Sequence, residues 1–171
     1  MFVSKFVVKH MKKSLLKLVF IFLLPFSLAA DEVPALKFTV AFSKSKVKVG
    51  DEVELIFKAQ IPTQYHIYGI YKKCEIEDDG PNMTEVVDFV LSGGTQVGVL
   101  SAVGEKIEHD DIFGCDEGVL HGVAEFRQKI KISSTKFSVA GTLKYQVCSE
   151  NSCGAHDFVF GLSDKNIKIK K

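Results

Sequence analysis

Arginine is nearly missing from this 171-residue sequence, since Arg127 is the only one. After its first 30 residues the chain has no apolar run approaching the ~20 residues that a membrane span needs. It also shows no convincing amphipathic helix pattern, no internal repeat and no low-complexity linker. These absences argue against a nucleic-acid-binding protein, a membrane-spanning mature chain and a helical or repeat fold.

The first 29 residues have the pattern of a secretory signal peptide. Residues 18–24 are all apolar, and Pro25 and a cleavage-site segment with the small residues Ser27, Ala29 and Ala30 follow them. This segment is preceded by five lysines: Lys5, Lys9, Lys12, Lys13 and Lys17. A membrane anchor is the alternative, but the apolar run is too short to span a bilayer. We therefore expect cleavage near Ala29 and export of a soluble domain over residues 30–171.

Cleavage changes the charge balance of the chain. Residues 30–171 hold 17 basic and 21 acidic residues, a formal net charge of −4. A mildly acidic domain with one arginine is a poor partner for nucleic acid. About 140 residues suffice for one domain with a proper hydrophobic core.

Strand patterns recur at short intervals along this domain. Apolar and polar residues alternate, as in half-buried strands, and turn residues such as Gly50 and Gly93 separate the runs. The strands predicted in this way lie at 36–42, 46–51, 53–59, 65–71, 86–91, 119–132, in a hairpin around residue 150, and at 167–169. About eight strands predict an all-β fold, an immunoglobulin-like antiparallel β-sandwich, with a small barrel as the alternative.

The hairpin contains two cysteines at matching positions. Residues 142–147 and 156–162 alternate on either side of Cys148 and Cys153, which flank four polar residues. This pattern predicts a β-hairpin with a four-residue loop, in which the two cysteines lie opposite each other. Opposed strand residues have Cα atoms about 4.5–5.5 Å apart, within the range of a disulfide.

Such a disulfide would stabilise the fold only weakly. In the chain-entropy model a six-residue ring contributes roughly 2 kcal/mol, against roughly 4 kcal/mol for a ring of about 40 residues. The bond would also lie on a surface turn, where a partner thiolate can reach a sulfur. We favour a redox function for Cys148 and Cys153 over a purely structural one.

Four segments and Cys153 together carry a family resemblance. The segments are Gly-Asp-Glu-Val-Glu-Leu at 50–55, Tyr-His-Ile-Tyr at 65–68, Phe-Arg-Gln-Lys-Ile at 126–130 and Tyr-Gln-Val-Cys at 145–148. In this order and spacing the chain resembles the N-terminal periplasmic domain of the thiol:disulfide interchange protein DsbD. The resemblance covers nearly the whole mature chain. It implies an immunoglobulin-like sandwich that passes reducing equivalents to thioredoxin-like periplasmic proteins, in disulfide correction or cytochrome c maturation.

The resemblance also assigns functions to individual residues. Cys148 and Cys153 match the redox pair, and Cys153 matches the cysteine that forms the mixed disulfide with the partner. Tyr68 matches an aromatic residue beside the pair. A further segment resembles an acidic loop whose aromatic cap shields the cysteines, with Ile112 or Phe113 as the cap: Asp110, Asp111, Ile112, Phe113 and Gly114. We expect this segment to open as a lid when a partner docks.

Two departures from the family pattern affect the expected partners. Family members usually have a Pro-Pro pair after the second cysteine, whereas Cys153 is followed by Gly154, Ala155 and His156. The sequence also ends at Lys171 without the family's transmembrane and thioredoxin-like segments. We therefore expect a standalone monomer without a cofactor, which receives electrons from a separate membrane donor. His156 either tunes a thiolate or is an ordinary solvent-facing strand residue.

Cys74 and Cys115 are not explained by the redox pair. In the family's arrangement the segments that hold them lie near that pair, and four cysteines in an exported chain favour full pairing. We expect a structural Cys74–Cys115 disulfide, with two free thiols as the alternative. Two other functions stay open: a non-catalytic disulfide-stabilised binding module and a zinc-stapled β domain. The chain has no H-x-H or H-E-x-x-H spacing, and we expect no metal site.

Overall fold

The alternating segments of the sequence form strands throughout the part of the chain that the structure describes. This structure, a computed structural model, describes residues 32–73, 82–111 and 114–171, which contain twelve strands and no helix. The strands are β1 (Thr39–Phe42), β2 (Lys46–Lys48), β3 (Glu52–Gln60), β4 (His66–Lys73), β5 (Glu85–Ser92), β6 (Gly94–Ala102), β7 (Lys106–Asp110), β8 (Cys115–Leu120), β9 (Val123–Ile132), β10 (Ser138–Cys148), β11 (Cys153–Ser163) and β12 (Lys168–Lys170). Residues 32–171 form one compact unit.

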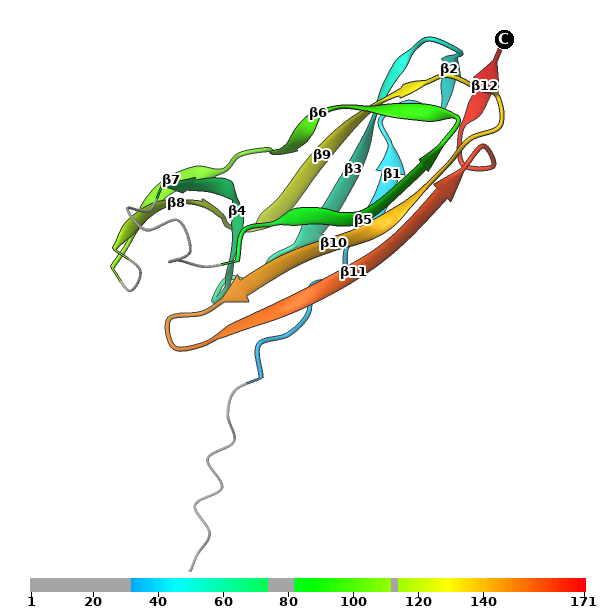
Figure 1. Ribbon diagram of the computed structural model, residues 1–171. Coiled ribbons are helices and arrows are strands. Elements are labelled where there is room, and N and C mark those ends of the chain that lie inside the picture. The colour runs from blue at the N-terminus through cyan, green and yellow to red at the C-terminus, as the bar shows by residue number, and fades with distance from the viewer. Residues whose placement is uncertain (1–31, 74–81, 112–113) are drawn as a thin grey trace, which may run out of the picture. The chain divides into compact units, whose positions relative to one another are not determined.

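Two antiparallel sheets make up most of this unit (Figure 1). One has the strand order β1-β3-β9-β6, and the other has the order β11-β10-β4-β8-β7, with β5 also paired to β10. A separate pair, β2 and β12, is parallel. The predicted all-β, immunoglobulin-like sandwich is confirmed.

The hydrophobic core joins the two sheets. Leu55 and Phe57 of β3 and Phe126 of β9 are completely buried, and they belong to the same cluster as Leu143 of β10 and Phe160 of β11. The rings of Phe57 and Phe160 meet edge to face, with centroids 4.8 Å apart. Because alternate residues of each central strand point into this core, the remaining residues face solvent or the functional site.

Three parts of the chain differ from the strand prediction. The run at 119–132 is divided between β8 and β9, because Gly122 takes a positive φ of 69° and turns the chain. Strand β6 was not predicted, since it has an irregular pairing with β9 around Gly98 and lacks clean alternation. Strand β7 was missed because four of its five residues are exposed.

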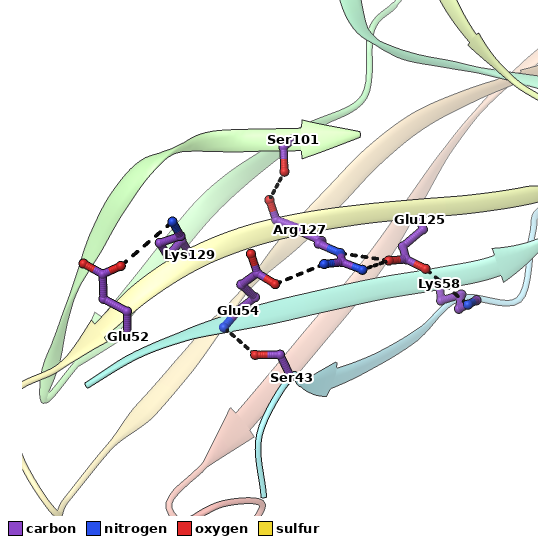
Figure 2. A network of polar contacts seen from close by, with 8 residues as sticks. All are labelled: Ser43, Glu52, Glu54, Lys58, Ser101, Glu125, Arg127 and Lys129. Carbon is purple, nitrogen blue, oxygen red and sulfur yellow. Dashed lines mark hydrogen bonds and ion pairs between the residues drawn. The ribbon is translucent and has the colours of Figure 1, made fainter. Parts of the chain in front are cut away.

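The single arginine takes part in a polar network on β3 and β9 (Figure 2). Its guanidinium donates to Glu125 and, over 3.3 Å, to Glu54, and Lys58 pairs with Glu125 at 3.2 Å. The hydrogen bonds from Arg127 lower the pKa of Glu125. Since these side chains are partly exposed, each pair contributes little to stability.

No helix in the described residues is long and apolar enough to span a bilayer.

Candidate functional site

The hairpin of β10 and β11 places the two cysteines of the predicted redox pair opposite each other. Cys148 and Cys153 are cross-strand partners, their Cα atoms are 4.1 Å apart, and their sulfurs form a disulfide. Four residues make the loop between them, which is closed by a hydrogen bond from the Ser149 amide to the Ser152 carbonyl at 2.8 Å. The Ser149 hydroxyl in turn accepts from the Ser152 amide at 3.2 Å. The disulfide and the loop length predicted from the sequence are confirmed.

The two sulfur-bearing residues differ strongly in exposure. Cys148 is 1 % exposed and packs with Tyr68 and Val119 in a small cluster of its own. The Gln146 side-chain amide points at the Cys148 sulfur over 3.6 Å. Cys153, by contrast, is exposed. A partner approaching from solvent therefore meets Cys153 first.

A cavity of about 640 Å³ lies beside the disulfide and brings most of the predicted site residues together. Tyr68 from β4, Asp110 at the end of β7, and Asp111 all line it, together with both cysteines. The Tyr68 hydroxyl donates to Asp110 Oδ2 at 2.7 Å. Burial, and then this hydrogen bond, raise the pKa of Tyr68. Tyr68 is therefore a neutral donor that fixes the Asp110 carboxylate at the cavity.

Three predicted residues lie outside the described part of the chain: Ile112, Phe113 and Cys74. The assignment of the cap and the pairing of Cys74 with Cys115 therefore stay predictions. Cys115 itself is 3 % exposed at the start of β8, and no cysteine in the described ranges is free.

The structure also places two histidines at the site that the motif analysis did not assign to the redox centre. His66, the first residue of β4, is the cross-strand partner of Cys148 and lines the same cavity. The His121 ring lies 5.8 Å from the His66 ring, centroid to centroid, and its Nε2 is 3.4 Å from Glu108 Oε1. The sequence offered one indication that His66 belongs to the site. His66 lies two residues before Tyr68, and residues two apart in a strand point to the same face.

A partly buried carboxylate, that of Glu105, supports this region. Glu105 Oε1 accepts from the amides of Ile70 and Tyr71 at 2.6 and 3.0 Å, where the pairing of β4 with β8 is irregular. A Cβ atom at Gly69 or Gly118 would overlap this carboxylate. These two glycines therefore leave the room in which Glu105 joins β4 to the β7–β8 hairpin.

Glu117 is a fully buried acid near the site. It is 0 % exposed in β8, and its Oε1 lies 3.2 Å from the Cys115 sulfur. Burial, with a smaller contribution from Asp110, raises the pKa of Glu117 to about 7. At neutral pH this carboxyl is close to the midpoint of its titration.

His156 does not face the redox pair. It pairs with Tyr145 across the hairpin, and alternation along β11 places it on the opposite face from Cys153. Its ring lies 5.6 Å from the Tyr145 ring, centroid to centroid. In the described ranges, no three His, Cys, Asp or Glu side chains gather in a group that could hold a metal ion.

Comparison with known proteins identifies similar structures only. No protein-family profile matches the sequence, and no curated protein does either. The N-terminal periplasmic domain of ScsB from Proteus mirabilis matches 77 % of this chain with 14 % identity and a TM-score of 0.52. The chain spans about half of that domain, 47 % of its length.

Two structures from Neisseria meningitidis match with lower TM-scores. The reduced DsbD N-terminal domain has 19 % identity and a TM-score of 0.41, over 80 % of this chain and 98 % of that one. The complex of the DsbD and PilB N-terminal domains has 19 % identity and a TM-score of 0.34, over 75 % and 87 %. The chain thus shares its fold with the ScsB N-terminal periplasmic domain. DsbD N-terminal domains are among the solved structures to which it is similar, as the sequence predicted.

Proposed function

We propose that this protein is a thiol–disulfide exchange module that passes reducing equivalents through Cys148 and Cys153 to other exported redox proteins. The observation that carries this proposal is the asymmetry of the hairpin disulfide, which has one exposed and one buried cysteine beside a cavity. A short-ring disulfide adds little stability, so its placement on a turn is better explained by exchange. The activity is that of a protein-disulfide reductase.

The asymmetry supports a separate role for each sulfur. In the reduced protein the Cys153 thiolate attacks a partner disulfide, forms a mixed disulfide and releases one partner thiolate. Cys148 then attacks the Cys153 sulfur, which re-forms the Cys148–Cys153 bond and releases the second partner thiolate. Two electrons and two protons pass to the partner. In reverse, Cys153 is the attacked sulfur and Cys148 the buried leaving thiol.

The acidic surroundings protect the reduced pair. Asp110 and Asp111 line the cavity beside the cysteines, and a nearby negative charge disfavours a thiolate. Tyr68 holds Asp110 in this position. Non-cognate oxidants then meet a thiol instead of the more reactive thiolate. Ile112 and Phe113 are the proposed cap of the same site.

The proposed setting is the periplasm, after cleavage of a signal peptide over residues 1–29. Thioredoxin-like proteins are the proposed redox partners of a monomeric module, in disulfide correction or cytochrome c biogenesis, and a separate membrane protein is the proposed electron donor. The similar ScsB domain is itself described as periplasmic, which supports this location.

Trapping a mixed disulfide tests the proposal. We expect a Cys148→Ser variant, treated with oxidised glutathione, to keep a glutathione adduct on Cys153, because no second thiol is left to resolve it. The matched variant Cys153→Ser should react at least tenfold more slowly, since Cys148 is buried. Mass spectrometry of the peptides locates each adduct.

Two results would contradict this assignment. Adducts found only through Cys148 would reverse the roles of the two sulfurs. No adduct in either variant would favour the non-catalytic, disulfide-stabilised binding module instead.

A further inference from the structure

We propose that His66 is the proton acceptor for Cys148 in the exchange reaction, and that His121 with Glu108 connects His66 to solvent. This inference rests on the proposed exchange function and assigns its proton-transfer step. The buried sulfur needs such a group, because Cys148 must lose a proton before it attacks and solvent hardly reaches it.

The strand register places His66 next to the buried sulfur. Cys148 and His66 are directly opposed across β10 and β4, and the next opposed pair is Val147 with Ile67. Val147 and Ile67 are both 0 % exposed in the main core. By alternation, His66 and Cys148 share the other face, where opposed Cβ atoms lie about 4.5–5.5 Å apart. Both residues line the cavity of the redox site.

Neighbouring rings fix the imidazole at this position. The His66 ring meets the Tyr68 ring edge to face, with centroids 5.3 Å apart. Tyr68 is itself held by its hydrogen bond to Asp110 and packs with Cys148. His121, whose partner Glu108 belongs to β7, is the second neighbouring ring. The side chains of His121 and Glu108 are 50 % and 47 % exposed, so this pair reaches solvent.

Charged groups of both signs surround His66, but burial has the largest effect on its pKa. His121 lies beside it at the end of β8, and the ionisable groups that line the cavity with it are Tyr68, Glu108, His109, Asp110, Asp111 and Glu150. Burial, and next the charge of His121, lower the pKa of His66, while Glu108 and Asp110 act in the opposite direction. The net lowering keeps His66 neutral near pH 7, the form that accepts a proton.

The proton-transfer step balances within the exchange reaction. After Cys153 has formed the mixed disulfide, neutral His66 takes the proton of the Cys148 thiol. The Cys148 sulfur then attacks the Cys153 sulfur, and the bond between Cys153 and the partner breaks. The partner sulfur leaves with the electron pair and takes a proton from solvent. In the reverse direction the protonated His66 returns its proton to the leaving Cys148.

Rapid-quench mass spectrometry of the reduced protein with oxidised glutathione tests this step. In His66→Phe and His66→Gln the mixed disulfide at Cys153 should form at the wild-type rate and resolve about 10²-fold more slowly, the usual contribution of a positioned base. The phenylalanine keeps a ring that can pack on Tyr68, and the glutamine keeps a polar side chain, so the two variants separate proton transfer from structure. His156→Gln, on the other face of the hairpin, is the matched control and should resolve normally.

The pH profile separates a proton acceptor from a structural residue. Wild-type resolution should rise with pH and level off once His66 is neutral, with a midpoint below the ordinary value of 6.5 because its pKa is lowered. The His66 variants should lose this step and keep rising with hydroxide. In His121→Gln the midpoint should move upward, since a neighbouring positive charge is removed.

Unchanged resolution and an unchanged pH profile in both His66 variants would overturn the proton-acceptor role and leave the exchange function intact. A wild-type protein that forms no mixed disulfide at all would overturn both proposals.

Discussion

Individual side chains at this site differ mainly in their contact with water. The two joined cysteines lie at opposite extremes of exposure, and Glu117 is a fully buried acid. Such a carboxyl is expensive to ionise, and its pKa of about 7 reflects that cost. Glu117 should therefore contribute to the pH dependence of the free energy of unfolding.

Glu117→Gln should remove part of that pH dependence. The folded protein keeps the Glu117 proton up to about pH 7, whereas the unfolded chain releases it near 4.5. Wild-type stability therefore falls as pH rises between these values, because the unfolded state gains ionisation first. Between pH 5 and pH 8 the wild type should lose about 2 kcal/mol more than the glutamine variant. Urea denaturation of both proteins at the two pH values measures this difference, and parallel pH curves would contradict it.

At the scale of elements, the β7–β8 hairpin matters most for the site. It contributes Glu108 and Asp110 to the lining of the cavity beside the disulfide. Four of the five residues of β7 are nevertheless exposed, so this strand buries little apolar surface. Its position depends on β8, whose pairing with β4 is irregular between Tyr68 and Lys72. Glu105 bridges this irregularity through two backbone amides. The hairpin is thus held by two short stretches of ladder with β4 and, between them, by the Glu105 carboxylate.

Gly118→Ala should displace this carboxylate. The new Cβ atom would overlap Glu105 Oε1, so the amides of Ile70 and Tyr71 would lose a charged acceptor. We expect a destabilisation of about 2 kcal/mol or more, and faster hydrogen exchange at those two amides.

Gly161→Ala is the matched control, because a Cβ atom there has nothing within 4 Å. It should change the stability by less than about 1 kcal/mol. Equal losses in the two alanine variants would show that Glu105 does not anchor the hairpin.

Across the whole molecule, the hydrophobic core and the proposed redox site are separate. The core of two sheets is built from apolar side chains of β3, β9, β10 and β11. The hairpin disulfide closes a ring of only six residues and contributes roughly 2 kcal/mol. Its reduction should therefore leave the sandwich folded, as a module that cycles between two redox states requires.

Titration in graded glutathione buffers should reduce Cys148–Cys153 first, at a potential above about −300 mV. Cys115, 3 % exposed, should stay bonded, in the predicted pair with Cys74, whose 42-residue ring contributes roughly 4 kcal/mol. Alkylation and peptide mass spectrometry follow each cysteine. Two free thiols at Cys74 and Cys115 in the oxidised native protein would disprove that pairing, and a lower potential for the hairpin would favour a structural disulfide.

The hairpin, its loop and its disulfide could be predicted from the sequence, because alternation and a four-residue polar loop act locally. Strands such as β3 followed from the same pattern. Strand β6 did not, since its irregular pairing interrupts the alternation, and the turn at Gly122 was hidden in a continuous apolar-polar run.

The neighbours of the disulfide were decided by tertiary structure. His66 lies opposite Cys148 only because β4 pairs with β10, and the shared core, not local sequence, selects that register. His121 and Glu108 reach the site through the pairing of β8 with β4 and β7. The room for Glu105 likewise exists only once Gly69 and Gly118 are brought together. Sequence alone set the disulfide pair through local strand geometry, whereas the groups proposed to move its protons and the acidic residues beside it were set by long-range packing.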